Sequence, residues 1–237
     1  MSSPSKRKKV DQLPNLEKVY GLKFPDSLGK FWKSCLKNSP LAPLKAIKNW
    51  NLVGPFKILA RQITFENRID ALLYHRCYHD LPEFQTFAVS KENGKRLCFY
   101  RLTPESLPFI VSVTRENDDI IMPKFEYISE TLEESVFSAK PKKSMVPGPN
   151  MVAPTLSSLG ISVFVKNDVG YRDLNMSDKK FRKILDKIEN AKDDNKRKEA
   201  FAPLLDIITC IQFANDECDF GMAYEFGYDL FIYRKVF

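Results

Sequence analysis

The chain has 237 residues, of which 43% are hydrophobic and 12% aromatic, so it is long enough for one large domain or two small ones and too apolar for a disordered, collagen-like or coiled-coil protein. Lys and Arg number 37 against 30 Asp and Glu, which gives a net charge of +7. No segment approaches the roughly 20 apolar residues of a membrane helix and the N-terminus has no apolar signal core, so we expect a soluble, intracellular protein without a membrane partner.

Residues 1–12 are predicted to form a disordered basic tail, because the run KRKK at 6–9 follows a Ser/Pro-rich start. Such a run is typical of a nuclear-import signal or a nonspecific phosphate contact, and a merely solubilising tail is the alternative. The positive charges of KRKK at 6–9 and of KPKK at 140–143 together equal the whole net charge of the chain. The rest of the chain is therefore nearly balanced in charge.

Residues 13–137 are predicted to form an α+β N-terminal domain. A short helix follows Leu16, and a second helix is indicated by apolar residues at helical spacing, namely Leu28, Phe31, Trp32 and Cys35. Short apolar runs then follow at 85–89, 96–100 and 109–113, and Asn93-Gly94 predicts a hairpin between the first two of these. We therefore expect N-terminal helices with a small antiparallel sheet.

Residues 138–155 are rich in Pro, Lys and small residues and are predicted to be a linker or surface loop. Residues 156–237 are predicted to form a mainly helical C-terminal domain. Ser177 precedes a helix with apolar positions Phe181, Ile184, Leu185 and Ile188, and a second helix begins at about Asp194, with Pro203 either kinking it or starting a new one. The predicted fold class is α+β.

The sequence predicts no metal or cofactor site in this chain. His75 and His79 are four residues apart with Cys77 between them, but they are the only histidines and their surroundings resemble a strand or loop instead of a helix. The five cysteines are scattered without a CxxC pair, which indicates reduced thiols. The phosphate-loop, dinucleotide-binding and serine-hydrolase motifs are also absent.

An acidic window near the C-terminus is the most informative charge pattern. Residues 199–233 contain no Lys or Arg but seven acids, which are Glu199, Asp206, Asp216, Glu217, Asp219, Glu225 and Asp229. Such a window attracts cationic ligands, so a basic partner or basic peptide is expected, unless lysines from elsewhere neutralise the acids. Asp216, Glu217 and Asp219 follow an apolar helix, where a carboxylate can act as general base toward a serine hydroxyl. A solvated helix end is the alternative.

At these residues the sequence resembles the histone PARylation factor family. The resemblance rests on QFANDECDFGM at 212–222 and EFGYDLF at 225–231, and it extends to KNDVGYR, AFAP, LVGP, DLPEFQT and LKFPDSLGKFWKSC at 166–172, 200–203, 52–55, 80–86 and 22–35. These motifs cover nearly the whole chain after the basic tail, in the family's order.

The resemblance implies a nuclear accessory factor, not an enzyme by itself, that binds the catalytic domain of DNA-damage-activated poly(ADP-ribose) polymerases at chromatin. The polymerase brings NAD, and Glu217 would deprotonate the acceptor serine of histones and other chromatin proteins. Asp216 is expected to contact the polymerase, and Tyr171 and Arg172 would lie at the docking surface. Asp219 adds to the negative field that attracts a basic serine peptide, and DNA contact is at most indirect.

Two further expectations follow from the comparison with that family. Its members continue beyond the DLF motif with another helical segment, whereas only residues 232–237 follow it here, so the chain resembles a C-terminally shortened member. Tyr171 and Arg172 can adjoin Asp216 and Glu217 only if two helices return antiparallel.

Three other interpretations stay open. The first is an interaction scaffold of the SMI1/KNR4 type, which the segment at 22–35 also resembles. The second is a nucleic-acid-associated protein, which the isoelectric point of about 9.0 motivates. The third is a free-standing hydrolase that uses the acid cluster.

Overall fold

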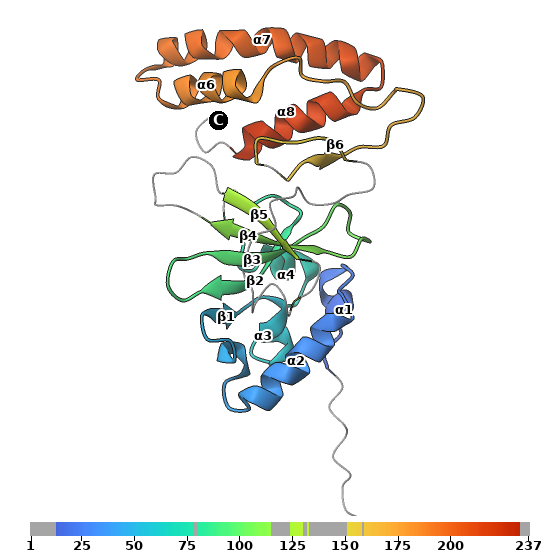
Figure 1. The fold of residues 1–237 in the computed structure, drawn as a ribbon, viewed down its shortest axis with the longest axis vertical. Coiled ribbons are helices and arrows are strands. Elements are labelled where there is room, and N and C mark those ends of the chain that lie inside the picture. The colour runs from blue at the N-terminus through green and yellow to red at the C-terminus, as the bar shows by residue number, and fades with distance from the viewer. Residues whose placement is uncertain are drawn as a thin grey trace, which may run out of the picture.

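The structure is a computed structural model that describes residues 13–77, 80–114, 124–129, 132, 151–157 and 159–232. An α+β part lies at one end of the molecule and a helical part at the other, so the predicted fold class is confirmed (Figure 1). The predicted tail at 1–12 and residues 138–150 of the predicted linker lie outside the described residues. None of the described helices is long and apolar enough to cross a membrane.

The N-terminal part combines short helices with a five-stranded antiparallel sheet in the order β1-β2-β3-β4-β5. Its elements are α1 (Leu16–Tyr20), α2 (Ser27–Asn38), η1 (Pro43–Lys45), β1 (Trp50–Leu52), α3 (Pro55–Leu59), α4 (Arg68–Leu73), β2 (Phe84–Ser90), β3 (Arg96–Tyr100), β4 (Phe109–Thr114) and β5 (Lys124–Ser129). The hairpin predicted at Asn93-Gly94 joins β2 to β3, and Gly94 has the positive φ of 66° that such a turn requires.

Aromatic side chains fill the core between α2 and the sheet. The apolar residues predicted for this helix, Leu28, Phe31, Trp32 and Cys35, are all buried. Trp32 contacts Phe56 of α3 at 5.9 Å between ring centroids, and Phe56 in turn contacts Phe87 of β2 at 6.2 Å. Helix α3 therefore lies between α2 and the sheet, and each ring adds apolar area to one continuous core.

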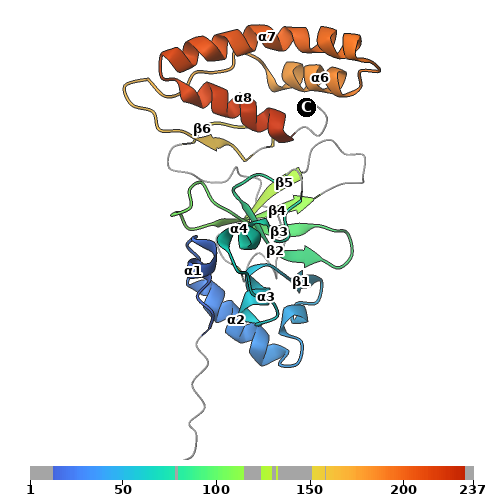
Figure 2. The same ribbon diagram turned by 180° about the vertical axis from the view of Figure 1, so that it is seen from behind.

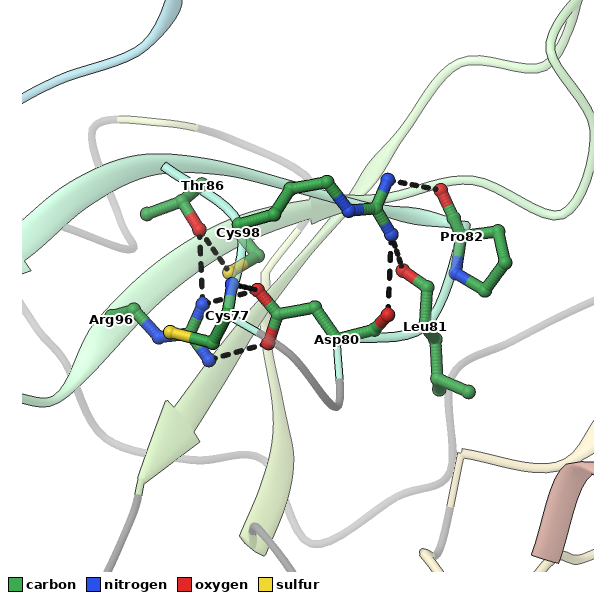
Figure 3. Close-up of polar contacts among 8 residues, drawn as sticks. Cys77, Asp80, Leu81, Pro82, Thr86, Arg96 and Cys98 are labelled. Atoms are coloured by element: carbon green, nitrogen blue, oxygen red, sulfur yellow. Dashed lines mark hydrogen bonds and ion pairs between the residues drawn. The ribbon is translucent and has the colours of Figure 1, made fainter. Parts of the chain in front are cut away.

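A buried ion pair joins β3 to the segment that precedes β2. Both Nη atoms of Arg96 donate to the Asp80 carboxylate, at 2.6 and 2.5 Å, and the Cys77 N–H donates to the same carboxylate at 2.8 Å (Figure 3). The Arg96 and Asp80 side chains are only 8% and 3% exposed. Because the pair is bidentate and further hydrogen-bonded, the two buried charges compensate each other.

The C-terminal part consists of a helical hairpin, a third helix and a two-stranded sheet. Its elements are β6 (Met151–Ala153), β7 (Ile161–Ser162), α6 (Asp178–Glu189), α7 (Asp194–Asp216) and α8 (Phe220–Ile232). Helices α6 and α7 lie side by side, and α8 lies between them and β6 in both views (Figures 1 and 2). The apolar residues predicted for α6 are buried against α7 and α8.

Helices α6 and α7 begin where the sequence predicted, and the structure adds two details. Helix α7 is continuous from Asp194 to Asp216 with Pro203 inside it, so Pro203 does not begin a new helix. Ser177 is the N-cap residue of α6, as predicted, but its side chain makes no capping hydrogen bond. Asp193 does cap α7, because its carboxylate accepts from the Lys196 N–H at 2.9 Å.

A third hydrophobic cluster joins the two parts of the molecule. It combines Phe84, Cys98, Tyr100, Val111 and Val113 of the sheet with Ala153, Leu159, Ile161, Tyr228 and Ile232 of the C-terminal part. Residues 151–153, which we predicted as linker, instead form β6 paired with β7. The reason is that Ala153 is buried in this shared cluster, which holds the end of the predicted linker in the fold.

Candidate functional site

The acidic motif, which consists of Asp216, Glu217 and Asp219, lies where α7 ends, as the sequence predicted. Cys218 has a positive φ of 66°, its N–H donates to the Asn215 carbonyl at 3.0 Å, and the Asp219 N–H donates to the Ala214 carbonyl at 2.8 Å. These bonds define a Schellman motif, which usually has glycine where this chain has Cys218. The tight turn places Glu217 at the helix terminus and directs the chain into α8.

Asp219 is the buried member of the acidic motif, with 5% of its surface exposed. One carboxylate oxygen accepts from the Gly170 N–H at 2.8 Å, and the other pairs with Arg172 at 2.9 Å. The carboxylate therefore attaches the segment at 166–172 to the end of α7. This burial disfavours direct contact between Asp219 and a substrate. The contribution of Asp219 to the negative field that attracts a basic peptide stays a prediction.

The segment at 166–172 is a tight hairpin followed by a close backbone contact. Lys166 and Val169 exchange backbone hydrogen bonds at 2.9 and 3.1 Å, and both Asn167 and Asp168 between them have positive φ. Asn and Asp tolerate this conformation better than other residues with a side chain. The short turn sets the position of the residues that follow it.

Gly170 and Gly221 bring this segment against α8. The Gly221 N–H donates to the Gly170 carbonyl at 2.8 Å, and a Cβ on Gly221 would lie 2.8 Å from that oxygen. Gly170 has a φ of 132°, and a Cβ there would lie 2.3 Å from the Phe164 carbonyl oxygen. Both positions therefore require glycine, and neither was identified as part of the site from the sequence.

Arg172 and Glu217 form an ion pair at the surface, so these two residues are neighbours, which the sequence analysis made conditional on the return of the chain. The Arg172 side chain is 46% exposed and that of Glu217 is 62% exposed. The hydrogen bond to Glu217 raises the pKa of Arg172, a group that is a cation throughout the physiological range. Arg172 also pairs with Asp219, so one arginine from outside the acidic window neutralises part of its charge.

Tyr171 makes an internal contact beside this pair. Its hydroxyl donates to the Glu225 carboxylate of α8 at 2.8 Å, and its ring is half-buried in the shared cluster. Burial raises the pKa of Tyr171 and also that of Glu225. Tyr171 thus holds the segment on α8, a contact that the sequence did not predict, and its part in partner docking stays a prediction.

Asp216 is exposed at the last position of α7 and has no side-chain hydrogen bond or ion pair among the described residues. The last turn of α7 contains no basic residue. Because the C-terminal end of a helix carries partial negative charge, two adjacent carboxylates are disfavoured there. Asp216 and Glu217 are therefore placed where their charges destabilise the end of α7 instead of stabilising it.

Exposed aromatic residues flank the acidic motif along the chain. Phe213 is 61% exposed and Phe220 is 59% exposed, and Phe164, before the hairpin, is 74% exposed. None of these three residues was predicted from the sequence as part of the site. A signal was present for Phe213, because the buried positions of α7 are 204, 207, 211 and 214 and residue 213 lies off that stripe.

No metal-ligand cluster is found in the part of the chain that the structure describes. His75 is half-buried, and burial lowers its pKa. His79, the other histidine considered as a ligand, lies outside the described residues.

Comparison with known proteins places the chain in a family. The family model described as Histone PARylation factor 1 matches residues 10–147 and 126–237. The chain is 33% identical to Histone PARylation factor 1 of Danio rerio over 92% of this chain and 74% of the relative. It is 30% identical to that of Mus musculus, over 94% and 77% respectively. The chain belongs to the Histone PARylation factor 1 family.

Proposed function

We propose that this chain is an accessory factor that binds the catalytic domain of a poly(ADP-ribose) polymerase and completes a shared active site. The observation that carries the proposal is the exposed Glu217 carboxylate, held by Arg172 at a helix end where negative charge is disfavoured. The family name links its members to histones and to PARylation. The chain supplies a catalytic residue and binds no cofactor alone, since NAD belongs to the polymerase.

The proposed chemistry needs only one group from this chain. Glu217 accepts the proton of the acceptor serine hydroxyl, and the serine oxygen forms a bond to the ribose carbon of NAD. The bond between that carbon and nicotinamide breaks, and nicotinamide leaves with the electron pair. A serine hydroxyl is too weakly acidic to react unaided near neutral pH, so a positioned carboxylate directs transfer to serine.

Docking would release Glu217 from its ion pair. Arg172 also contacts the buried Asp219 at 2.9 Å, so it stays anchored when Glu217 turns to a substrate. Its planar guanidinium is suited to a bidentate contact with a carboxylate of the polymerase. Near Glu217 in the sequence, the exposed Asp216, Phe213 and Phe220 provide charge and apolar area, which a protein interface can use.

The acceptor is proposed to be a serine in a basic peptide of histones or other chromatin proteins. Asp216 is the unpaired acid nearest to Glu217 in the sequence, and no lysine or arginine lies between residues 199 and 233. Cationic residues next to the serine would therefore be attracted to this end of α7. The proposed location is the nucleus, on chromatin at DNA breaks, with DNA contacted at most indirectly.

The test is mass-spectrometric mapping of ADP-ribose on a histone peptide that contains serine, glutamate and aspartate. A polymerase and NAD are used alone, with this chain, with Glu217→Gln, or with Glu199→Gln, which makes the same change at an exposed position of α7. Serine modification is expected with the unchanged chain and with Glu199→Gln only, while Glu217→Gln still binds the polymerase. Serine modification that persists with Glu217→Gln would favour the interaction-scaffold alternative instead.

A further inference from the structure

Strand β3 is associated with two buried arginines that differ in their partners. Arg96, its first residue, is 7% exposed and pairs with Asp80 (Figure 3). Arg101, directly after its last residue, is 3% exposed and has no carboxylate within ion-pair distance among the described residues. A buried cation without a counter-ion is costly, so the surroundings of Arg101 require an explanation.

Neutral groups hold the Arg101 guanidinium in a fixed orientation. Nε and Nη2 donate to the Lys23 carbonyl at 3.3 and 3.0 Å, and Nη1 donates to Gln85 Oε1 at 3.1 Å. The rings of Phe24 and Phe99 lie 5.0 and 5.5 Å from the guanidinium carbon. These bonds use three of the five N–H groups of an arginine, which leaves one free on each Nη. Two such N–H groups are what a bidentate oxyanion contact requires.

Arg101 lines a cavity of about 380 Å³ where β2 begins and β3 ends, which we call the Arg101 cavity. Leu22, Leu72, Phe84 and Leu102 contribute apolar wall, and Gln85 lies beside the guanidinium. Gln85 Nε2 is near the Tyr20 hydroxyl but meets hydrogen-bond geometry with no described group. The volume and the mixture of apolar wall with a few polar groups are typical of small-molecule sites.

The charges around the Arg101 cavity favour an anion. Arg76 also lines it, and among the described residues it donates only to backbone carbonyls, those of Asp80, Leu81 and Pro82. Glu83 is the one carboxyl group among the lining residues, and burial raises its pKa. Burial also lowers the pKa of Arg101 to about 10, the direction expected of a cation that lacks a counter-ion.

We propose that the Arg101 cavity binds a small organic acid, in which a carboxylate or phosphate on an apolar body accepts the two free N–H groups of Arg101. The apolar body would lie against Leu22, Leu72 and Leu102. The cavity is lined by residues of the N-terminal part and includes neither Arg172 nor Glu217. The inference is therefore independent of the proposed active site.

The first experiment maps binding of 4-phenylbutyrate to the full chain by amide chemical shifts. Phenyl phosphate distinguishes a phosphate from a carboxylate preference, and 4-phenylbutyramide is the neutral control of nearly equal shape. We expect saturable shifts at Lys23, Gln85 and Leu102 with at least one of the two acids, and at least about tenfold weaker binding of the amide. Equal binding of the amide, shifts confined to other residues, or no saturable shift with either acid would overturn the proposal.

The second experiment changes the rim of the Arg101 cavity, because substitution of Arg101 itself also removes bonds that hold the fold. Thr103 lines the cavity, is exposed, and its side chain makes no hydrogen bond with a described residue. Thr103→Glu is expected to weaken binding of the acid about tenfold, and Thr103→Lys is expected to retain or strengthen that binding, through charge alone. An equal effect of the two variants would contradict an oxyanion at this position. Unchanged amide spectra elsewhere would show that both variants fold.

Discussion

The two arginine–carboxylate pairs of this protein lie in opposite environments. Arg96 and Asp80 are only 8% and 3% exposed and are bound in a bidentate pair inside the sheet region. Arg172 and Glu217 are 46% and 62% exposed and meet through a single Nη2 atom at the end of α7. The first pair cannot exchange partners without disrupting the core, whereas the second pair can open to a substrate or a partner.

This difference separates charges that hold the fold from charges that are available for function. Removal of one member of the buried pair leaves the other uncompensated in a region of low polarity, which is strongly destabilising. Removal of Glu217 from the exposed pair leaves Arg172 in contact with water and still paired with Asp219, so the loss is small. Glu217, the proposed base, can therefore leave its ion pair and contact a partner with little loss of folding stability.

The largest effect is expected from Asp80→Asn. The substitution keeps the shape of the side chain but leaves the buried Arg96 without its counter-ion, so the free energy of unfolding should fall by about 3 to 5 kcal/mol. Urea denaturation followed by circular dichroism measures it. Asp70→Asn, an equal change in the exposed first turn of α4, should cost less than about 1 kcal/mol. Equal losses in the two variants would remove the distinction between buried and exposed charges.

The next effect depends on pH and concerns Asp229. This residue is 2% exposed and accepts the Leu156 N–H at 2.9 Å, and burial raises its pKa to about 7. Glu225 and Asp178 act in the same direction, and Arg182 opposes them. Between about pH 4 and pH 7 the folded protein therefore retains a proton that the unfolded chain has released, so this carboxyl makes stability fall as the pH rises.

Asp229→Asn should remove that contribution, because an amide oxygen can still accept the Leu156 N–H without a charge. We expect the variant to be more stable than the unchanged chain at pH 8 by about 2 to 4 kcal/mol and little different at pH 4. Thermal unfolding at both pH values measures it. Asp206→Asn, at an exposed position of α7, should show no such gain. A gain that does not depend on pH would contradict the assignment.

Two glycines of α8 provide a matched pair for the contact between the hairpin segment and the helix. A Cβ on Gly221 would approach the Gly170 carbonyl at 2.8 Å, whereas a Cβ on Gly227 would meet nothing within 4 Å. Gly221→Ala should destabilise by about 1 to 3 kcal/mol and reduce serine modification, because the added Cβ displaces the segment that carries Arg172 from its place at the proposed docking surface. Gly227→Ala should stabilise by about 0.5 to 1 kcal/mol through helix propensity and leave serine modification unchanged. Urea denaturation and peptide mapping of both variants distinguish these outcomes.

The smallest effect on stability is expected from Glu217→Gln. The Glu217 side chain is 62% exposed, and Arg172 keeps its ion pair with the buried Asp219 at 2.9 Å. The unfolding midpoint in urea should therefore stay within error of the unchanged chain, while serine modification is lost. A large fall in the midpoint would mean that the exposed pair holds the fold and would weaken the comparison.

Much of this arrangement could be predicted from local sequence signals. The Asn93-Gly94 turn, the apolar stripe of α2 and the end of α7 at Asp216 each depend on neighbouring residues, and each was predicted correctly. The pairing of Arg172 with Glu217 required a return of the chain that was stated as a condition, and the structure meets it.

The parts that were not predicted depend on contacts between distant residues. The role of Gly170 and Gly221 follows from a backbone approach across some fifty positions, which no local pattern indicates. Composition predicts a linker or surface loop at 151–153, but Ala153 is buried in the third hydrophobic cluster, which joins the two parts of the molecule. The contact of Tyr171 with Glu225 could likewise not be predicted from the sequence, because neither residue type requires such a partner.

The most direct test of the central claim is the initial rate of serine modification as a function of chain concentration, with a polymerase, NAD and a histone peptide. The claim that Glu217 is the base predicts that Glu217→Gln lowers the maximal rate by about 10² to 10⁴-fold without raising the half-saturating concentration. A maximal rate within a few-fold of the unchanged chain, with only the half-saturating concentration increased, would show that Glu217 serves binding and would contradict its proposed role in the chemistry.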